Sequence, residues 1–525
     1  MMASDLTVLV TPPAWAYSPI VPFSFIELAA YMQMKGLDVE ILDVKRDFYV
    51  TQPRGSFQEV LREIIRRLNR KKPPYVGLSC FTGDYWQCLE LAERIKKSFK
   101  TTIIVGGFQP TIRPEDFLYP KSPFDVVVIG EGEETLCEIV SAGNNADNLE
   151  EIKGIAFLKG SKLVKTPIRS FIEDLSLLPR PAYHMLDMDY YLTPNRNILR
   201  YLVFSGVYIL TGRGCPYNCT YCSCRAIYKA QGQRVTVRHR PISKIIDTLK
   251  WLKDSYRIDS FYISDDTFAI PGSRAAEFCR EYKKSGLSMV WSASMRVDLL
   301  NESLVEKMKD AGCVQIDFGV ESGSQRSLDL MKKGIKVEDV YRAFALCKKY
   351  RIRTFANIMV NTPGESIEDV KLTTQLMNRI KANVYGISVT VPLPGSELFD
   401  KYIGINNLSK EEYRIFSRPG LFQKILDPRL RLASHNLNID MLYIMLNLRF
   451  FVLKSFIGLT FAGWYWRTFL KSVRKSAYIK GLIVSFFQQI CRYMRFLIRS
   501  LERRQDISRE ADRGEICEAA EKVYF

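Results

Sequence analysis

The chain contains very little histidine. Only three of its 525 residues are histidines, His184, His239 and His435, and none of them lies in the first 150 residues. Histidine is the commonest metal ligand in proteins. A metal centre or cofactor bound by the first 150 residues therefore has no histidine ligand from that part of the chain.

Long apolar runs, targeting features and repeats are lacking too. No run reaches the roughly 18 uninterrupted apolar residues expected of a membrane-spanning helix, and the first ten residues carry no basic stretch typical of a signal peptide. Low-complexity tracts and fixed-period repeats are absent, whereas 47% of the residues are apolar. We therefore expect a cytoplasmic globular protein with roughly two to four domains.

Three of the twelve cysteines are clustered in the run Cys-Pro-Tyr-Asn-Cys-Thr-Tyr-Cys, as Cys215, Cys219 and Cys222. Three thiolates can hold three irons of a [4Fe–4S] cluster and leave the fourth iron open to a small molecule. The run follows a predicted strand at 207–211, which places it at a strand's carboxyl end. Cys224 could instead complete a four-cysteine zinc or iron–sulfur site, although two thiolates one residue apart fit one tetrahedral ion poorly. A disulfide knot is a weaker alternative. The following cysteines are expected to be reduced core residues: Cys80, Cys88, Cys137, Cys279, Cys313 and Cys347.

The first part of the chain alternates short apolar runs with amphipathic stretches. This alternation predicts a doubly wound parallel sheet, which binds ligands beyond the carboxyl ends of its strands. The predicted strands are 6–11, 38–43, 75–79, 102–105 and 125–129, and the predicted helices are 23–35, 57–68 and 85–99. Glycines in the turns after the strands would let a bulky ligand approach the backbone.

A second alternating region follows a hairpin predicted at 152–167 and a proline-rich linker at 178–183. Six strand–helix pairs, the last without its helix, are too few for a closed eight-stranded barrel and predict a partial (β/α)6 barrel. The predicted strands are 207–211, 260–264, 289–293, 314–319, 353–360 and 385–391, and the predicted helices are 242–253, 274–284, 302–311, 337–349 and 366–381. Ser366 and Asp369 form a capping box that fixes the start of the last helix.

The cysteine run resembles the signature of the radical S-adenosylmethionine (radical SAM) enzymes. Two turns in the first 150 residues resemble the cobalamin (B12)-binding domain of one branch of that family. They are Gly-Gly-Phe-Gln-Pro-Thr at 106–111 and Gly-Glu-Gly-Glu-Glu-Thr at 130–135. This branch includes the class B radical SAM methyltransferases and the anaerobic tetrapyrrole cyclase. The resemblance implies four regions: a Rossmann-like cobalamin-binding domain at 1–148, a hairpin and linker at 149–200, a radical SAM barrel at 201–400, and a helical region at 401–525.

The resemblance also implies the cofactors and their residues. The cofactors are a [4Fe–4S] cluster on Cys215, Cys219 and Cys222, SAM and cobalamin. The implied SAM-binding residues are Tyr221, Asp265, Asp266, Arg296, Glu321 and Ser322. The implied cobalamin-binding residues are Pro12, Pro13, Ser79, Thr82, Gly106, Gly107, Pro110, Thr111, Gly130, Glu131 and Gly132. The Asp-x-His-x-x-Gly motif of better-known B12 domains is absent, so the cobalt would have no histidine ligand from this domain.

The region after residue 400 is helical in pattern, basic and rich in aromatic residues. Between Arg449 and Arg504 the sequence has twelve Lys and Arg against one acidic residue. An apolar stripe and a basic stripe at helical spacing favour peripheral contact with an anionic membrane, on its inner face. Packing of the apolar stripe on the barrel is the alternative, and no nucleic-acid partner is expected. The apolar stripe consists of Ile483, Phe487, Ile490, Met494, Leu497 and Leu501, and the basic stripe of Arg492, Arg495, Arg499 and Arg503.

The resemblance implies a cobalamin-dependent enzyme that methylates an unactivated carbon. In such enzymes one SAM methylates the cobalt, and a second yields a deoxyadenosyl radical that abstracts hydrogen from the substrate. The expected substrate is hydrophobic, such as an isoprenoid lipid, hopanoid or tetrapyrrole, and the expected reductant is a flavodoxin or ferredoxin. A cyclase or another C–C bond-forming enzyme of the same branch is the first alternative, and a non-catalytic corrinoid and cluster sensor is the second.

Overall fold

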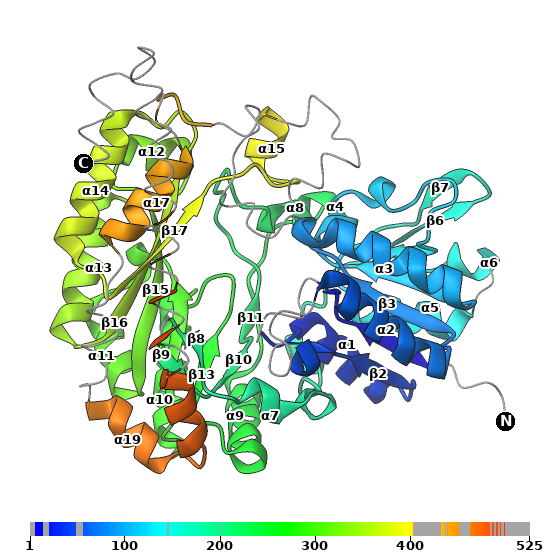
Figure 1. Cartoon of the computed structure of the whole chain (residues 1–525), viewed down its shortest axis with the longest axis horizontal. Coiled ribbons are helices and arrows are strands. Elements are labelled where there is room, and N and C mark those ends of the chain that lie inside the picture. Colours follow the sequence, from blue (N-terminus) through cyan, green and yellow to red (C-terminus); the bar gives the residue numbers. More distant parts are fainter. Residues whose placement is uncertain are drawn as a thin grey trace. The chain divides into compact units, whose positions relative to one another are not determined.

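The computed structural model divides the described chain into two compact units (Figure 1). The first unit contains the described residues up to Tyr191, the segment Ser223–Lys244 and helix α15 (Glu397–Tyr402). The second contains Leu192–Cys222, Ile245–Pro392 and the described residues after 421. The structure describes residues 6–13, 20–48, 56–143, 146–200, 202–402, 432–435, 437, 439–450, 463–483, 486–487, 490–491, 494 and 498.

The first unit is built on a seven-stranded sheet with the order β2-β1-β3-β4-β5-β6-β7. The first five strands are parallel, which confirms the predicted doubly wound sheet. Their order reverses between β1 and β3, and ligands of such sheets bind where the order reverses. The strands are β1 (Thr7–Val10), β2 (Val39–Leu42), β3 (Tyr75–Ser79), β4 (Thr102–Gly106), β5 (Val126–Val128), β6 (Ile155–Lys159) and β7 (Lys162–Lys165).

Helices cover both faces of this sheet. Helices α1 and α5 pack together on one face, and α2 and α3 pack together on the other. Helix α2 begins at a capping box formed by Ser56 and Glu59, and its buried Val60, Leu61 and Ile64 recur at helical spacing. The helices are α1 (Phe23–Met34), α2 (Phe57–Lys71), α3 (Tyr85–Ser98), α4 (Phe108–Ile112), α5 (Glu133–Ala142), α6 (Ala146–Leu149), α7 (Met188–Tyr191) and α8 (Cys224–Ala230).

The second unit is built on a six-stranded parallel sheet with the order β10-β13-β14-β15-β16-β17. Each strand pairs with the next one along the chain, as a partial (β/α)6 barrel requires. The strands are β10 (Val207–Ile209), β13 (Ser260–Ile263), β14 (Val290–Met295), β15 (Cys313–Glu321), β16 (Arg353–Val360) and β17 (Val384–Val389).

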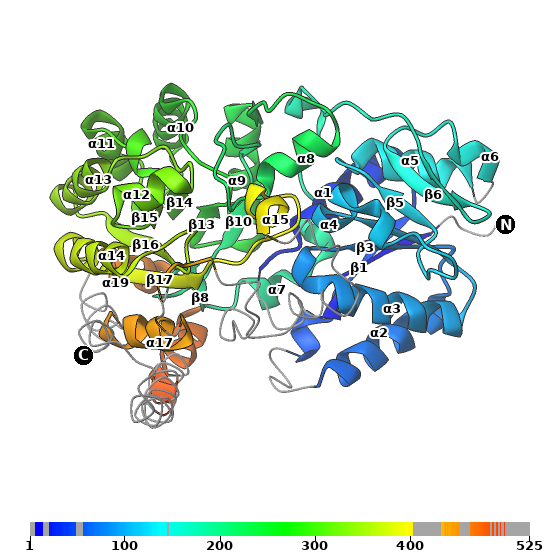
Figure 2. The ribbon, with the colours of Figure 1, turned by 90° about the horizontal axis from the view of Figure 1, so that it is seen from above.

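Helices line one side of this sheet (Figure 2). Helix α14 starts after the Ser366–Asp369 capping box, as predicted. The helices are α9 (Ile242–Tyr256), α10 (Gly272–Lys284), α11 (Glu302–Asp310), α12 (Gln325–Leu330), α13 (Val337–Lys349) and α14 (Ile367–Ile380). Short strands β8 (Asn195–Leu199) and β9 (Leu202–Phe204) form a hairpin before β10, and β11 (Gly212–Arg213) and β12 (Arg238–His239) are two-residue strands.

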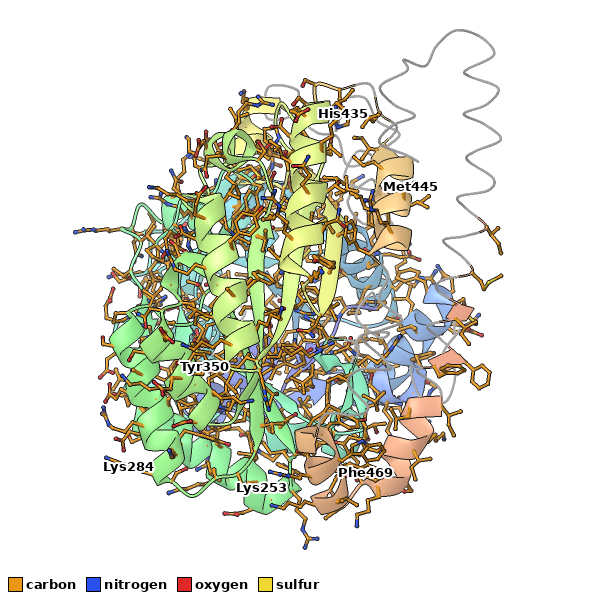
Figure 3. All side chains as sticks on the ribbon, turned by 90° about the vertical axis from the view of Figure 1, so that its left-hand side faces the viewer. Lys253, Lys284, Tyr350, His435, Met445 and Phe469 are labelled. Atoms are coloured by element: carbon orange, nitrogen blue, oxygen red, sulfur yellow. The ribbon has the colours of Figure 1, made fainter. Side chains whose placement is uncertain are left out.

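The region after residue 400 packs in part on the second unit. Helix α17 (Ile439–Arg449) lies against β16 and β17. Helix α19 (Gly463–Lys471) lies at the end of the unit that carries Lys253, in the last turn of α9, and Lys284, the last residue of α10 (Figure 3). The buried Tyr478 hydroxyl donates to Asp259 at 3.1 Å, and the Ser472 hydroxyl donates to the same carboxylate at 2.6 Å.

The two predicted stripes of this region fall only partly on described residues. Ile483, Phe487, Ile490 and Met494 are 40 to 61% exposed. Tyr465, Ser472 and Tyr478 are buried against the second unit, whereas these described members of the apolar stripe are exposed and do not pack on the barrel. In the part of the chain that the structure describes, no helix is long and apolar enough to cross a membrane. Leu497, Leu501, Arg492, Arg495, Arg499 and Arg503 lie outside the described residues.

Candidate functional site

The three clustered cysteines lie on the loop between β11 and α8. Cys215, Cys219 and Cys222 are reduced cysteines of intermediate exposure, whereas most other described cysteines are buried. Cys224, two residues after Cys222, is the first residue of α8. Within the described ranges, no three His, Cys, Asp or Glu side chains already converge as a metal site. The donor set itself, three accessible thiols without histidine, fits an iron–sulfur cluster that keeps one iron open.

Asp265, at the carboxyl end of β13, fixes the start of this loop. Its carboxylate accepts the backbone N–H of Thr211 at 2.6 Å and of Gly212 at 3.2 Å, and it also accepts the Thr211 hydroxyl. Burial raises the pKa of Asp265 to about 6, against the effect of these hydrogen bonds. Its neighbour Asp266 accepts the backbone N–H of Gly214 at 3.1 Å. Both predicted SAM residues therefore hold the loop's backbone.

Arg296, which follows β14, supports the middle of the loop. Its guanidinium lies 3.5 Å from the centroid of the ring of Tyr217, a residue that comes between the first two cysteines in the sequence. It also pairs with Asp298 at 3.0 Å and donates to the carbonyls of Lys333 and Gly334. Arg296 is only 5% exposed, so its charge is compensated within the protein.

Glu321 closes a buried charged cluster at the carboxyl end of β15. Its Oε1 lies 2.8 Å from Nζ of Lys333 and accepts the Tyr221 hydroxyl at 3.2 Å. Glu321 has a φ of 66°, a conformation that residues other than glycine rarely adopt. Such strain is often found at functional sites. The cluster joins two of the predicted SAM residues and adds Lys333.

Ser322, the neighbouring predicted SAM residue, serves the local backbone. Its hydroxyl lies 3.1 Å from that of Thr373 and accepts the backbone N–H of Ser324 at 3.1 Å. Ser322 is 3% exposed. These bonds join the turn after β15 to α14, so the hydroxyl has a structural task already.

The sheet face opposite the helices is open near its carboxyl end. Near the carboxyl ends of β16 and β17 every second residue is half-buried, whereas β14 and β15 each have one half-buried residue there, and their neighbours are buried. The accessible residues are Ser294, Gly319, Asn357, Met359, Gly386 and Ser388.

An ion pair between a partly exposed arginine and a buried aspartate lies in the same sheet. Arg200, in the turn of the β8–β9 hairpin, pairs with Asp317 of β15 at 2.8 Å. Asp317 is 1% exposed and also accepts the Tyr262 hydroxyl at 3.1 Å and the Gln315 amide at 2.6 Å. Burial raises the pKa of Tyr262, so its hydroxyl stays a donor. This ion pair therefore attaches the β8–β9 hairpin to β15 of the six-stranded sheet.

In the first unit, the predicted cobalamin residues gather at the carboxyl edge of β3, β4 and β5. Gly107 has a φ of +100°, and a Cβ there would lie 3.1 Å from both N and O of Cys80. The Thr111 hydroxyl donates to the Gly107 carbonyl at 2.8 Å and accepts the backbone N–H of Gly130 at 3.0 Å. The turns after β4 and β5 are thus fixed to one another.

The turn after β3 joins the same edge through amide contacts. Thr82 donates to Gln109 at 2.7 Å, and Gln109 donates to Asp116 at 3.2 Å. Ser79 and Pro110 are buried beside them, and Pro12 and Pro13 are buried after β1. The edge therefore presents small and polar groups that could face a bulky, amide-rich ligand.

Glu131 has an internal partner. Its carboxylate pairs with Arg238 at 2.9 Å and accepts the backbone N–H of Ile172 at 2.9 Å. Gln231 lies against Gly130, and its amide donates to the Ile129 carbonyl at 3.1 Å. Glu131 therefore attaches the turn after β5 to the segment Ser223–Lys244. Gly132 precedes α5 and lies near Leu28.

The sequence interpretation missed Lys333, Arg200 and Asp317. For Asp317 a signal existed, because polar Gln315 and Asp317 alternate with apolar residues along the strand predicted at 314–319. No local signal distinguishes Lys333 from surface lysines, since its partner Glu321 lies in another element.

Two family models match the chain. Residues 209–377 match the Radical SAM superfamily, and residues 16–140 match the B12 binding domain. The first match covers the cysteine loop and most of the six-stranded sheet, and the second covers most of the doubly wound sheet. Both agree with the predicted fold class and with the predicted cofactors: a [4Fe–4S] cluster, SAM and cobalamin.

Relatives and solved structures agree with these matches. The chain is 29% identical to an uncharacterized methyltransferase of Pyrococcus horikoshii, over 68% of this chain and 75% of the relative. It is 27% identical to the anaerobic magnesium-protoporphyrin IX monomethyl ester cyclase of Rubrivivax gelatinosus, over 74% and 66%. The radical SAM methyltransferase TsrM from Kitasatospora setae, solved with cobalamin and [4Fe–4S] cluster bound, has a TM-score of 0.60 and 19% identity, over 76% and 74%. This last likeness concerns the fold.

Proposed function

Because the chain belongs to the radical SAM enzymes that carry a B12-binding domain, we propose that it transfers a methyl group from SAM to an unactivated carbon. The observation that carries the proposal is the braced loop of Cys215, Cys219 and Cys222 in a chain that also holds a B12-binding sheet. A methyltransferase among its relatives supports methyl transfer over other reactions of the branch.

The three cysteines would hold the cluster, and the surrounding residues would position it. When bound, the cluster and SAM supply a carbon-centred radical, and the corrinoid supplies the methyl group. We assign Asp265, Asp266 and Arg296 to holding the loop, because their polar atoms bond its backbone or stack on Tyr217. We propose Tyr221 and Glu321, which are hydrogen-bonded to each other, as side chains that contact SAM, whereas Ser322 acts through the turn after β15.

The corrinoid would lie at the carboxyl edge of the doubly wound sheet. Gly106, Gly107 and Gly130 keep the backbone free of Cβ atoms there. Thr82 and Thr111 offer hydroxyls beside them. Glu131 would act by holding its turn through Arg238. Residues 1–150 would supply no histidine ligand to the cobalt, because they contain no histidine.

The open face of the six-stranded sheet would receive the substrate. Met359 offers an apolar contact there, while Ser294, Asn357 and Ser388 offer hydrogen-bonding groups. We propose a mainly hydrophobic substrate with at least one polar group, such as a modified isoprenoid, hopanoid or tetrapyrrole. A radical SAM enzyme also needs a reductant, for which we propose a flavodoxin or ferredoxin. We propose peripheral membrane contact through the region after residue 400.

The test is an anaerobic purification with the cluster reconstituted, followed by incubation with SAM labelled in its methyl group. About one bound corrinoid per chain and labelled methyl in product would support the proposal. Cys219→Ala should abolish formation of 5′-deoxyadenosine, whereas Cys491→Ala, an exposed cysteine elsewhere, should not.

The cyclase relative motivates the second candidate. Formation of 5′-deoxyadenosine with ring closure and without labelled methyl in product would favour that candidate. A reduced, fully loaded protein that forms no 5′-deoxyadenosine with any substrate tried would instead leave a sensor.

A further inference from the structure

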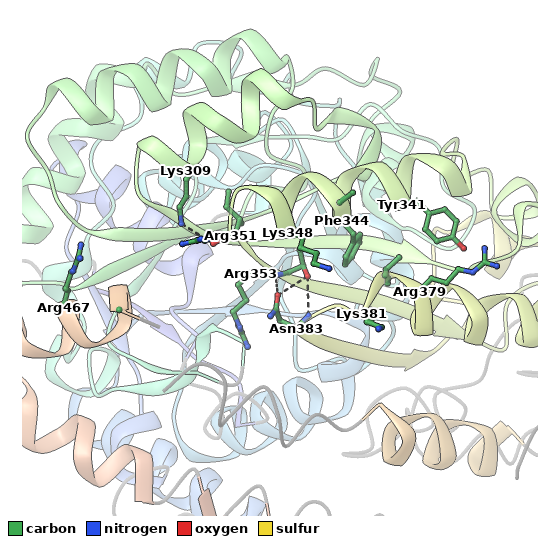
Figure 4. Close-up of a pocket in the computed structure, with 15 residues that line it drawn as sticks. Lys309, Tyr341, Phe344, Lys348, Arg351, Arg353, Arg379, Lys381, Asn383 and Arg467 are labelled. Atoms are coloured by element: carbon green, nitrogen blue, oxygen red, sulfur yellow. Dashed lines mark hydrogen bonds between the residues drawn. The ribbon is translucent and has the colours of Figure 1, made fainter. Parts of the chain in front are cut away.

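A large basic groove lies at the amino end of the six-stranded sheet. Its volume is about 1190 Å³, and it lies where β16 begins, α13 and α14 end, and α19 passes (Figure 4). Fifteen residues line it, of which seven are Lys or Arg and none is acidic. The seven cations are Lys309, Lys348, Arg351, Arg353, Arg379, Lys381 and Arg467.

The charges of this groove are not neutralised by acidic partners. Among the described residues, none of the seven forms an ion pair, although neighbouring surface lysines such as Lys349 and Lys283 do. Lys309 donates instead to the carbonyl of Arg351 at 3.2 Å. Basic residues near helix carboxyl ends complement the helix dipole. That effect explains Lys348 and Arg379, at the ends of α13 and α14, but not Arg467, which α19 brings from the opposite side.

Arg353 forms the inner wall of the groove and is itself buried, with 5% of its surface exposed. Its terminal nitrogens donate to the carbonyls of Leu199 and Arg200 and to the Gln315 side-chain oxygen, while its Nε has no hydrogen-bond partner among the described residues. A buried guanidinium without a carboxylate partner is costly. Among the described residues that line the groove, no carboxylate neutralises this charge.

The groove lies far from the cysteine loop. Arg353 begins β16, whereas the loop follows the carboxyl end of β10, and all strands of this sheet are parallel. Eight residues of β16 span roughly 25 Å. An anion in the groove is therefore not the reacting group.

Helix α19 connects the groove to exposed apolar side chains. Gly463 and Arg467 line the groove, and Leu470, three residues after Arg467, is 63% exposed. Residues three and four apart share one face of a helix. Trp466 and Val473 nearby are 40% and 57% exposed. Basic and exposed apolar side chains thus lie side by side at this end of the unit.

We propose that this basic groove binds phosphate groups. Phosphate oxygens accept charge-assisted hydrogen bonds from Lys and Arg, and Arg can bind them through two nitrogens at once. Two sources share this chemistry: the headgroups of an anionic phospholipid membrane and a free phosphorylated small molecule. The exposed apolar residues of α19 favour the headgroups. The inference does not depend on methyl transfer.

The test compares the full-length protein with the triple variant Arg379→Gln/Lys381→Gln/Arg467→Gln. All three side chains are exposed, so the fold should survive, which circular dichroism would check. Binding is measured by sedimentation with vesicles of phosphatidylcholine, with or without phosphatidylglycerol, and by calorimetry with inorganic pyrophosphate. Each basic residue near an anionic lipid surface contributes about fivefold in affinity, so we expect vesicle binding to fall about 100-fold in the variant.

A matched control carries Lys100→Gln/Lys121→Gln/Lys162→Gln, which removes the same charge from exposed lysines of the first unit. Loss of binding in the groove variant but not in the control supports the proposal. Pyrophosphate binding without vesicle binding would identify a free phosphate as the source. Equal loss in both variants, no binding of either probe, or binding of a single-stranded oligonucleotide alone would overturn the proposal. The single variant Arg467→Glu repeats the test should the triple variant misfold.

Discussion

Single residues around the cysteine loop are held by buried charge. Glu321 and Lys333 have side chains only 9% and 7% exposed, and each is the ionic partner of the other. A buried carboxylate that loses its partner keeps the cost of desolvation without the attraction that offset it. The stability of this cluster therefore depends on both members being present.

Lys333→Met should lower the free energy of unfolding by about 3 to 5 kcal/mol, because it leaves the Glu321 carboxylate buried with only the Tyr221 hydroxyl beside it. Urea denaturation of the metal-free protein would measure the loss. The double variant Glu321→Gln/Lys333→Met should recover a large part of it. A single variant as stable as the natural protein would show that the pair contributes nothing.

Asp265 should make stability depend on pH. Burial raises its pKa to about 6 in the folded chain, above the unfolded value, so the folded chain favours the protonated carboxyl. The contribution of Asp265 to the free energy of unfolding is therefore full below the unfolded pKa and is lost as the pH rises through 6. From pH 5 to 7.5 the loss is about 1.4 kcal/mol. The free energy of unfolding of Asp265→Asn, measured relative to the natural chain, should therefore rise by that amount over the same interval. A constant difference would contradict the shift.

The sequence predicted which residues gather at this site better than it predicted their partners. Cys215, Asp265 and Glu321 could be placed because each follows a strand of a parallel sheet. The bonds that occupy Asp265, Arg296 and Glu131 depend on distant segments, so local spacing could not show that these side chains already have internal partners.

At the scale of elements, the turn after β4 depends on a backbone that only glycine tolerates. Gly107 combines a positive φ with close approach to the backbone of Cys80, whereas Gly36 has a φ of +76° and no atom within 4 Å of its missing Cβ. The two glycines therefore separate the effect of backbone strain from that of crowding.

Gly107→Ala should destabilise the protein by about 3 kcal/mol, against about 1 kcal/mol for Gly36→Ala, which meets strain alone. Chemical denaturation would give both values. Titration with hydroxocobalamin should show weaker binding in the first variant only. Equal destabilisation by the two substitutions would contradict the crowding described for Gly107.

Most elements could be predicted because their periodicity is local. The parallel strands of both sheets and the capping box of α14 lie where apolar spacing placed them. The hairpin of β6 and β7 was predicted as a separate motif, yet it extends the first sheet antiparallel to β5. Such pairing is decided by register between distant strands, which apolar spacing does not encode.

At the scale of the whole second unit, the region after residue 460 is attached through Tyr478. Its hydroxyl accepts the backbone N–H of Ser205 at 3.0 Å and donates to Asp259. Burial raises the pKa of Asp259, whereas the hydrogen bonds from Ser472 and Tyr478 lower it. Two buried polar groups thus depend on one hydroxyl.

Tyr478→Phe should cost about 1 to 3 kcal/mol, because it leaves the Ser205 N–H buried without an acceptor. Limited proteolysis should then cleave the segment after residue 460 faster. Tyr350→Phe is the control, since it removes a hydroxyl bonded to Glu302 at an exposed position. Similar behaviour of the two variants would mean that Tyr478 does not anchor the segment.

The salt bridge between Glu131 and Arg238 joins a turn of the doubly wound sheet to a segment that follows the cysteines in the chain. Each unit consists of several separate stretches of the chain, and stretches of the two units alternate along the sequence. A recombinant fragment that ends at the proline-rich linker would leave Glu131 without its arginine and lack α8. The two cofactor domains are thus not interchangeable modules, and exchange of the B12-binding half between relatives would have to carry Ser223–Lys244 with it.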